Sequence, residues 1–225
     1  MGAAATTLKA RKFPVQDRSK ATREAIHAAA IQVLMREGVR QCTTTRVAER
    51  AGVSVGSLYQ YYPNRDALLA AVLSEHLTGI ADAMSNALAS ACGKPVADVS
   101  AALVTSFLET KLRNPDESSA LYAVSEERGG AEMIARLRVR TLAAIARCLE
   151  CAPDIRLSNP AWSGAVAFDA LIGPVRSVLE GHIARDQIPA IRDELIVMLT
   201  AYLTTVGRVK PGQLRFAGDV TDNVA

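Results

Sequence analysis

The segment Gly52–Gly56 holds a serine at the spacing where many hydrolases carry their nucleophile. Its sequence, Gly-Val-Ser-Val-Gly, matches G-x-S-x-G literally. That chemistry needs the serine on a sharp turn from a strand to a helix, followed along the chain by an acid and a histidine. Here a helical pattern precedes Gly52, and His182 needs a parallel sheet to reach Ser54. A serine hydrolase is therefore the alternative hypothesis, and we expect a protein that is not an enzyme.

Four cysteines offer a second kind of chemistry. Cys148 and Cys151 form a C-x-x-C pair, whereas Cys42 and Cys92 stand apart from them. A structural zinc site needs a second ligand pair, and a redox pair needs a strand-to-helix turn; the sequence offers neither. The histidines have no partner at ligand spacing: His27, His76 and His182. We predict no metal and no cofactor, with reduced thiols that pack as small apolar residues.

A stronger pattern is a pair of short helices around a glycine turn. Thr44 or Thr45 can cap a segment that ends at Gly52, and Ser54 can cap another that runs to about Tyr62. Glycine at position 52 suits the positive φ of a tight turn. The second segment leaves an outward face without a carboxylate, made of Ser54, Val55, Gly56, Ser57, Tyr59, Gln60 and Tyr61. Such a face can approach DNA, because hydroxyl and amide groups contact base edges and phosphates.

The N-terminal third is basic although the chain as a whole is nearly neutral. Residues 1–66 contain eleven Lys or Arg and five Asp or Glu, a net charge of +6, whereas the full chain carries +3. A basic end on a mildly acidic body favours a polyanionic partner that contacts one end only. Taken alone, the same asymmetry is equally typical of a solvated surface.

Residues 18–73 closely resemble the DNA-binding domain of TetR-type transcriptional regulators. The resemblance is strongest in the core Ala-Gly-Val-Ser-Val-Gly-Ser-Leu-Tyr-Gln-Tyr-Tyr-Pro-Asn-Arg-Asp-Ala-Leu-Leu, which ends at Leu69. It implies a homodimer that binds double-stranded operator DNA through the second short helix, and a helical body whose small-molecule ligand releases the DNA. By position, it implies phosphate contacts from Thr44 or Thr45, Arg46, Tyr61 and Arg65, and contacts to bases or backbone from Ser54, Val55, Gly56, Ser57, Tyr59 and Gln60. The family often has histidine where Tyr61 stands, so in this chain a tyrosine hydroxyl would replace the imidazole at that phosphate contact.

Prolines and glycines divide the whole chain into helices. After a first helix from Ser19 to Gly38 and a long one after Asn64, later helices are expected to begin near Pro95, Pro115, Gly130, Pro160 and Pro189. The sequence therefore predicts an all-α fold of about nine helices. The predicted parts are a mobile basic arm (1–17), a three-helix helix-turn-helix domain (18–66), a larger helical ligand-binding and dimerisation domain (67–209) and a disordered tail (210–225).

The longest stretch without a charged residue is Ala51–Asn64, fourteen residues. A membrane-spanning helix needs roughly 20 apolar residues, and the N-terminus has no signal-peptide core. We therefore expect no membrane partner and a cytoplasmic protein.

The helical body supplies candidates for a dimer interface and for a ligand cavity. We expect the last two long helices of each subunit to form a four-helix interface, with an intramolecular core as the alternative; the candidates are Phe168, Leu171, Val175, Val178, Leu195, Met198, Leu199 and Tyr202. A ligand cavity, with ordinary packing as the alternative, is expected from Phe107, Tyr122, Met133, Trp162 and Phe168. Three arginines on one helix would meet an anionic ligand or solvent: Arg136, Arg138 and Arg140.

Overall fold

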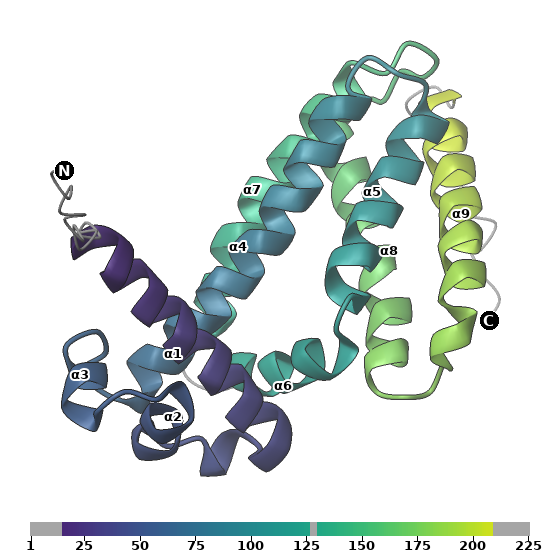
Figure 1. Ribbon diagram of the computed structural model, residues 1–225. Helices are drawn as coiled ribbons and strands as arrows, with labels where there is room; N and C mark the ends of the chain where they lie inside the picture. Colours follow the sequence, from purple (N-terminus) through teal and green to yellow (C-terminus); the bar gives the residue numbers. More distant parts are fainter. Residues whose placement is uncertain (1–14, 127–129, 209–225) are drawn as a thin grey trace, which may run out of the picture. The chain divides into compact units, whose positions relative to one another are not determined.

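The computed structural model describes residues 15–126 and 130–208, and the regular elements in these ranges are all helices (Figure 1). Nine α-helices, α1 to α9, and two short 3-10 helices, η1 (Val39–Gln41) and η2 (Arg185–Gln187), make up this part of the chain. The predicted all-α fold is therefore confirmed. The predicted disordered tail and residues 1–14 of the predicted arm lie outside the described residues. The chain divides into two units, the first ending at Val72 and the second beginning at Leu73.

The first unit is built on helix α1 (Val15–Glu37), against which helix α2 (Thr44–Ala51) packs. One apolar stripe of α1 is buried: Ile26, Ala29, Ala30, Val33 and Leu34. The predicted start at Ser19 is wrong, because the helix already begins at Val15. The sequence signal for this start is Pro14, since proline favours the first helical positions.

The helix-turn-helix has the predicted turn and one cap that differs from the prediction. Helix α2 is capped by Thr43, whose Oγ1 accepts the backbone N–H of Arg46 at 3.4 Å, and not by the following threonines. Gly52 has φ 68°, the left-handed conformation that favours glycine, and so it ends α2 as predicted. Helix α3 (Val55–Tyr59) is capped by Ser54, whose Oγ accepts the backbone N–H of Ser57 at 3.0 Å.

Helix α4 (Arg65–Ala91) begins in the first unit and ends in the second. Its start is the predicted one, because Asn64 Oδ1 accepts the backbone N–H of Ala67 at 2.8 Å. By length and composition alone, α4 is the one described helix that passes as a membrane span. The core residues along it include Leu69, Val72, Ile80, Met84 and Leu88.

The second unit adds five helices to its part of α4. These are α5 (Val96–Leu112), α6 (Pro115–Ser125), α7 (Gly130–Glu150), α8 (Pro160–Leu179) and α9 (Ile188–Arg208). Asparagines cap α6 and α8 directly before their prolines, at Asn114 and Asn159, as the prolines predicted. Helix α8 ends at Leu179, and Gly181 takes φ 77° two residues later, in the left-handed conformation typical of a residue after a helix.

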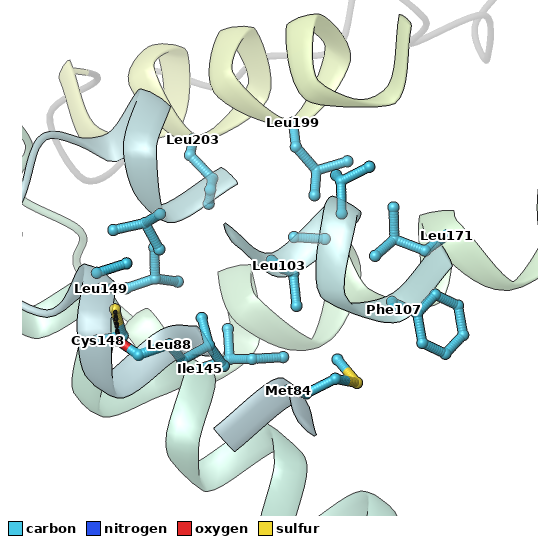
Figure 2. Close-up of a cluster of buried hydrophobic side chains, with 14 of the residues drawn as sticks. Met84, Leu88, Leu103, Phe107, Ile145, Cys148, Leu149, Leu171, Leu199 and Leu203 are labelled. Carbon is cyan, nitrogen blue, oxygen red and sulfur yellow. Dashed lines mark hydrogen bonds between the residues drawn. The ribbon is translucent and has the colours of Figure 1, made fainter. Parts of the chain in front are cut away.

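The core of the second unit joins side chains from α4, α5, α7, α8 and α9 (Figure 2). Leu88, Leu103, Ile145, Leu171 and Leu203 are each almost completely buried in it. Most candidates for the predicted dimer interface are buried within a single chain, as in the intramolecular alternative that the sequence left open: Leu171, Val175, Val178, Leu195 and Leu199. Of the other candidates, Met198 is exposed, and Phe168 and Tyr202 are partly buried. Apolar periodicity gives the buried face of a helix, but it does not give the number of chains that bury it.

Candidate DNA-binding surface and ligand cavity

The outward face of α3 is held by two local contacts. Ser54 Oγ lies 2.8 Å from Ser57 Oγ, so both hydroxyls at the start of the helix are fixed by each other. Leu58 points inward and is completely buried. The Tyr59 side chain is half exposed, and its hydroxyl lies 3.3 Å from Thr44 Oγ1. Leu58 therefore anchors α3 to its unit, whereas Gly56 and Tyr59 on the same helix stay exposed.

The residues that the sequence predicts as DNA contacts differ in their solvent exposure. Thr45, Arg46, Ser54, Gly56, Tyr59 and Gln60 are exposed; Val55, Ser57, Tyr61 and Arg65 are partly exposed; Thr44 is buried. Thr44 is therefore placed to position Tyr59 rather than to contact a large partner directly. No Asp or Glu lies between Glu49 and Asp66, so α3 itself carries no negative charge.

The structure leaves room for a side chain at Gly56. A Cβ atom at this position would meet only Ser54 Oγ, at an ordinary contact distance of 3.8 Å. Glycine in a helix costs roughly 0.5–1 kcal/mol relative to alanine. A glycine kept at this exposed position suits a surface to which another molecule's backbone comes close.

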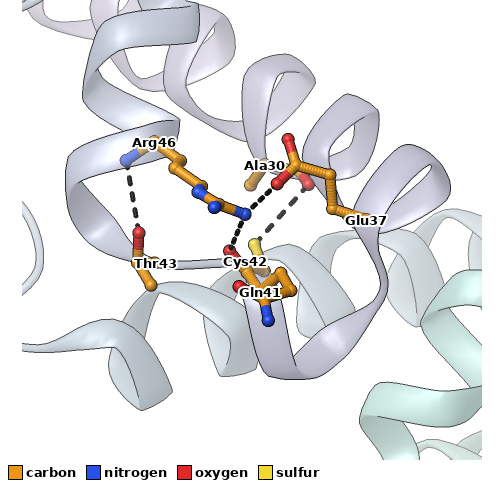
Figure 3. Close-up of polar contacts among 6 residues, drawn as sticks. All are labelled: Ala30, Glu37, Gln41, Cys42, Thr43 and Arg46. Atoms are coloured by element: carbon orange, nitrogen blue, oxygen red, sulfur yellow. Dashed lines mark hydrogen bonds and ion pairs between the residues drawn. The ribbon is translucent and has the colours of Figure 1, made fainter.

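Arg46 is tied to its own unit in the free protein (Figure 3). Its guanidinium forms an ion pair with Glu37 and lies 3.5 Å from the carbonyl oxygen of Gln41. Both Arg46 and Glu37 are well exposed. Exposed ion pairs contribute little, about 0–1 kcal/mol, so a phosphate can replace Glu37 at small cost.

Arg65 braces the loop before α2. Its Nε donates to the carbonyl oxygen of Cys42 at 3.0 Å, and its Nη2 donates to that of Val39 at 2.8 Å. A long-range contact of this kind cannot be derived from local spacing. The phosphate contact implied for Arg65 stays a prediction, beside this observed structural role.

The G-x-S-x-G match does not form a hydrolase site. Ser54 stands between helices α2 and α3, where its Oγ is used as a helix cap. His182, on the surface of the second unit, lies 3.5 Å from Glu180 through its Nδ1. The strand-to-helix turn that this chemistry needs is therefore replaced by a turn between two helices.

The second unit contains a cavity of about 180 Å³ lined by helices α4 to α8. Three of the five predicted ligand contacts line it, namely Phe107, Tyr122 and Phe168. The rings of Phe107 and Phe168 meet edge to face, with centroids 5.5 Å apart. The wall is otherwise mostly aliphatic, with Leu73, Leu77, Ile80, Met84, Leu121, Ile134, Leu137 and Ile172 among its residues.

Polar side chains that the sequence did not predict also line this cavity. His76 and Lys111 come from α4 and α5, and Thr141 comes from α7. Burial, and then the charge of Lys111, lower the pKa of His76 to about 4. Burial also lowers the pKa of Lys111. The imidazole is therefore neutral at neutral pH.

Two family models match the chain along most of its length. The model described as "Bacterial regulatory proteins, tetR family" matches residues 26–72, which include α2 and α3. The model described as "Tetracyclin repressor-like, C-terminal domain" matches residues 95–203. The chain belongs to the TetR family.

A curated relative agrees with this assignment over part of its length. The uncharacterized HTH-type transcriptional regulator YvkB of Bacillus subtilis (strain 168) is 38% identical over 55 residues, which are 24% of this chain and 29% of that protein. The match thus spans less than a third of the relative's length.

Three solved structures share the fold of this TetR-family chain. A bacterial regulatory protein in the tetR family from Rhodococcus RHA1 has a TM-score of 0.63 at 18% identity, with 81% of this chain and 96% of that chain covered. A transcriptional regulator from Rhodococcus sp. Rha1 has a TM-score of 0.64 at 19% identity, with 84% of this chain and 99% of that chain covered. The fatty acid degradation regulator FadR from Bacillus halodurans has a TM-score of 0.62 at 17% identity, with 79% of this chain and 97% of that chain covered. At these identities the likeness supports the fold.

Two predicted ligand contacts of the TetR-family chain do not line the cavity. Trp162 is 68% exposed near the start of α8, and Met133 is partly buried on α7 outside the cavity wall. Arg138 does line it, but it pairs with Asp169, with Nη2 2.8 Å from Oδ2. Arg140 forms an ion pair with Asp82, and Arg136 is exposed. Helical spacing predicted which residues share a face of α7 and α8, but not which face turns to the cavity.

Two of the four cysteines of this TetR-family chain, Cys42 and Cys148, are buried as packed residues, whereas Cys92 and Cys151 are exposed, contrary to the prediction. Cys148 is buried and donates to the carbonyl oxygen of Leu88 at 3.4 Å. Burial, with lesser effects from Cys92 and Cys151, raises its thiol pKa to about 11. The proximity of Cys92 to this pair was not predicted. Among the described residues, no group of three or more His, Cys, Asp or Glu is placed to hold a metal ion.

Proposed function

We propose that this chain is a sequence-specific, DNA-binding transcriptional repressor that a small molecule releases from its operator. The observation that carries the proposal is the exposed α3 face, which presents Tyr59, Gln60 and Ser54 with no carboxylate on the same helix. Hydroxyl, amide and aromatic groups on a helix that fits the major groove are suited to base edges and phosphates. The role is binding rather than catalysis, and its place is the cytoplasm, where the chromosome is.

The proposed active form is a homodimer joined through the exposed faces of α8 and α9. On α8, Trp162 and Val166 are exposed and lie one helical turn apart; on α9, Val197 and Ala201 do the same. Helix α8 packs against α9 within the chain. Two such pairs together make a four-helix interface, and a twofold dimer places two α3 helices on successive major grooves, roughly 34–36 Å apart.

The proposed coupling between ligand and DNA runs through helix α4. Its residues from Leu73 onward line the cavity, and its first residues belong to the unit that carries α3. A ligand weakens operator binding tenfold if it binds the DNA-free conformation about 1.4 kcal/mol more tightly. Since the helix is continuous, a shift at the cavity is transmitted to the first unit.

The test is to select fragments of the parent genome with the purified protein and to measure the affinity for the selected sequence at several salt concentrations. We expect enrichment of a sequence with twofold symmetry. Affinity should fall steeply with salt, with log K against log salt having a slope of about −5 or steeper, because several phosphates are neutralised. No enrichment, or a flat salt response, would contradict the proposed function.

A further inference from the structure

The cavity in the second unit has an apolar wall with one polar region. Helix α4 contributes Leu77, Ile80 and Met84, and the edge-to-face rings of Phe107 and Phe168 close one side. An apolar cavity of about 150 Å³ in another protein accommodates benzene. A cavity of about 180 Å³ therefore accommodates an apolar group of about one ring or a short alkyl chain.

The polar region consists of one buried imidazole nitrogen and one partly buried ammonium group. His76 Nε2 is buried and has no hydrogen-bond partner, while Nδ1 of the same ring lies 3.5 Å from Glu117 Oε1. Lys111 lines the same cavity and is close enough to His76 to lower the pKa of the imidazole. An unpaired buried nitrogen costs free energy, and so to a lesser degree does a partly buried ammonium, unless a ligand satisfies them.

The charge balance of the wall favours an anionic ligand. Arg138 is already paired with Asp169, and its guanidinium lies 5.7 Å from the ring centroid of Phe168. Within residues 15–126 and 130–208, Lys111 forms no ion pair with a carboxylate, and burial alone accounts for its lowered pKa. The wall thus carries one cation whose charge the described residues leave unbalanced.

We propose that this cavity binds a small apolar monocarboxylate, with the carboxylate against Lys111 and His76 and the apolar body against the rings of Phe107 and Phe168. The location rests on the proposed ligand response, whereas the ligand class rests on the wall itself. One carboxylate oxygen accepts from the Lys111 ammonium. The other accepts from His76 Nε2–H, in the neutral tautomer that carries its proton on that nitrogen.

A single negative charge fits this wall better than two. Lys111 supplies one unbalanced positive charge, and the remaining surface is apolar. A phosphate monoester brings roughly two negative charges at neutral pH and several more acceptors, and burying them without donors is costly. An uncharged ligand leaves the ammonium unpaired.

The test compares carboxylates with their uncharged amides on the full-length protein. Isothermal titration calorimetry with benzoate and benzamide, and with hexanoate and hexanamide, separates the effect of the charge from that of the ring or chain. We expect at least one carboxylate to bind roughly tenfold or more tightly than its amide, because hydrogen bonds to charged groups are strong. This comparison needs no variant, so it does not depend on the folding of one.

Lys111→Met then removes the ammonium and keeps a long apolar side chain. We expect it to weaken carboxylate binding by about tenfold to a hundredfold and to leave amide binding unchanged. Lys94→Met, at an exposed lysine outside the cavity, is the matched control and should bind as the unmodified protein does. Amides that bind as tightly as both carboxylates, or a Lys111→Met protein with undiminished carboxylate affinity, would overturn the inference.

The inference and the proposed function fail in different ways. If a carboxylate binds through Lys111 but does not release operator DNA, the ligand class is supported and the proposed release is wrong. If an uncharged compound releases the DNA and neither carboxylate binds, the release is supported and the ligand class is wrong.

Discussion

At the scale of single residues, His76 shows how burial sets the protonation of a side chain. Lys111 on α5 and Glu117 on α6 interact with it, and Tyr122 on α6 and Arg138 on α7 line the same cavity. Burial and then Lys111 lower its pKa from 6.5 to about 4. Glu117 does not offset these effects, although it lies 3.5 Å from Nδ1. The folded protein therefore keeps this imidazole neutral in a pH range where the unfolded chain protonates it.

This difference predicts a pH-dependent stability. Above pH 6.5 the imidazole is neutral in both states, and the free energy of unfolding does not depend on it. As pH falls from 6.5 to about 4, the unfolded state binds the proton first, so the free energy of unfolding falls by about 3 kcal/mol in total. Urea unfolding of the unmodified protein and of His76→Gln across this range measures the effect.

The variant should lose this part of the pH dependence. His182→Gln is the control, because His182 is exposed, with 72% of its side-chain surface accessible, and its removal should leave the slope as it is. Parallel pH profiles for the unmodified protein and His76→Gln would show that the pKa of His76 is not lowered in the folded state.

Single residues also show where local sequence information ends. The caps at Ser54 and Asn64 and the turn at Gly52 follow from side-chain chemistry within three residues, and the structure confirms them. The contacts of Arg65 with Cys42 and of His76 with Glu117 join distant positions. No local spacing predicts such contacts, so the polar part of the cavity was missed.

At the scale of helices, α8 and α9 divide their residues between two sides. The inner side supplies Leu171, Leu195 and Leu199 to the core, whereas the outer side exposes Trp162 and Val197. Apolar residues on both sides are what the proposed dimer requires, with one side in the core of the chain and the other against a partner. The periodicity predicted the stripes, but it did not separate the core of the chain from a dimer interface.

The outer side gives a test of the dimer. Val197→Glu places a charge on a residue that is 65% exposed in the single chain, so the fold should persist while the dimer dissociation constant rises by roughly tenfold or more. Analytical ultracentrifugation at micromolar concentration measures this. Val139→Glu on α7 is the matched control, because Val139 is 70% exposed and lies outside α8 and α9. If Val139→Glu dissociates the dimer and Val197→Glu does not, the interface lies elsewhere.

At the scale of the whole molecule, the net charge is distributed unevenly along the chain. The first 66 residues carry a net charge of +6, although the full chain carries +3. The basic end holds α3, and the rest holds the apolar cavity. This division was predicted from composition and motif, because a charge imbalance is a property of the sequence itself. The identity of the operator and of the ligand depends on shapes that composition does not contain.

The account depends most on the claim that the exposed face of α3 contacts operator DNA. The direct measurement is the operator affinity of Tyr59→Ala beside that of the unmodified protein, with urea unfolding of both and with Tyr59→Phe to separate the ring from the hydroxyl near Thr44. Because Tyr59 is half exposed and Leu58 anchors the helix, the fold should persist. We predict operator binding weaker by about 1–3 kcal/mol for Tyr59→Ala. An unchanged operator affinity in a folded Tyr59→Ala protein would contradict the claim.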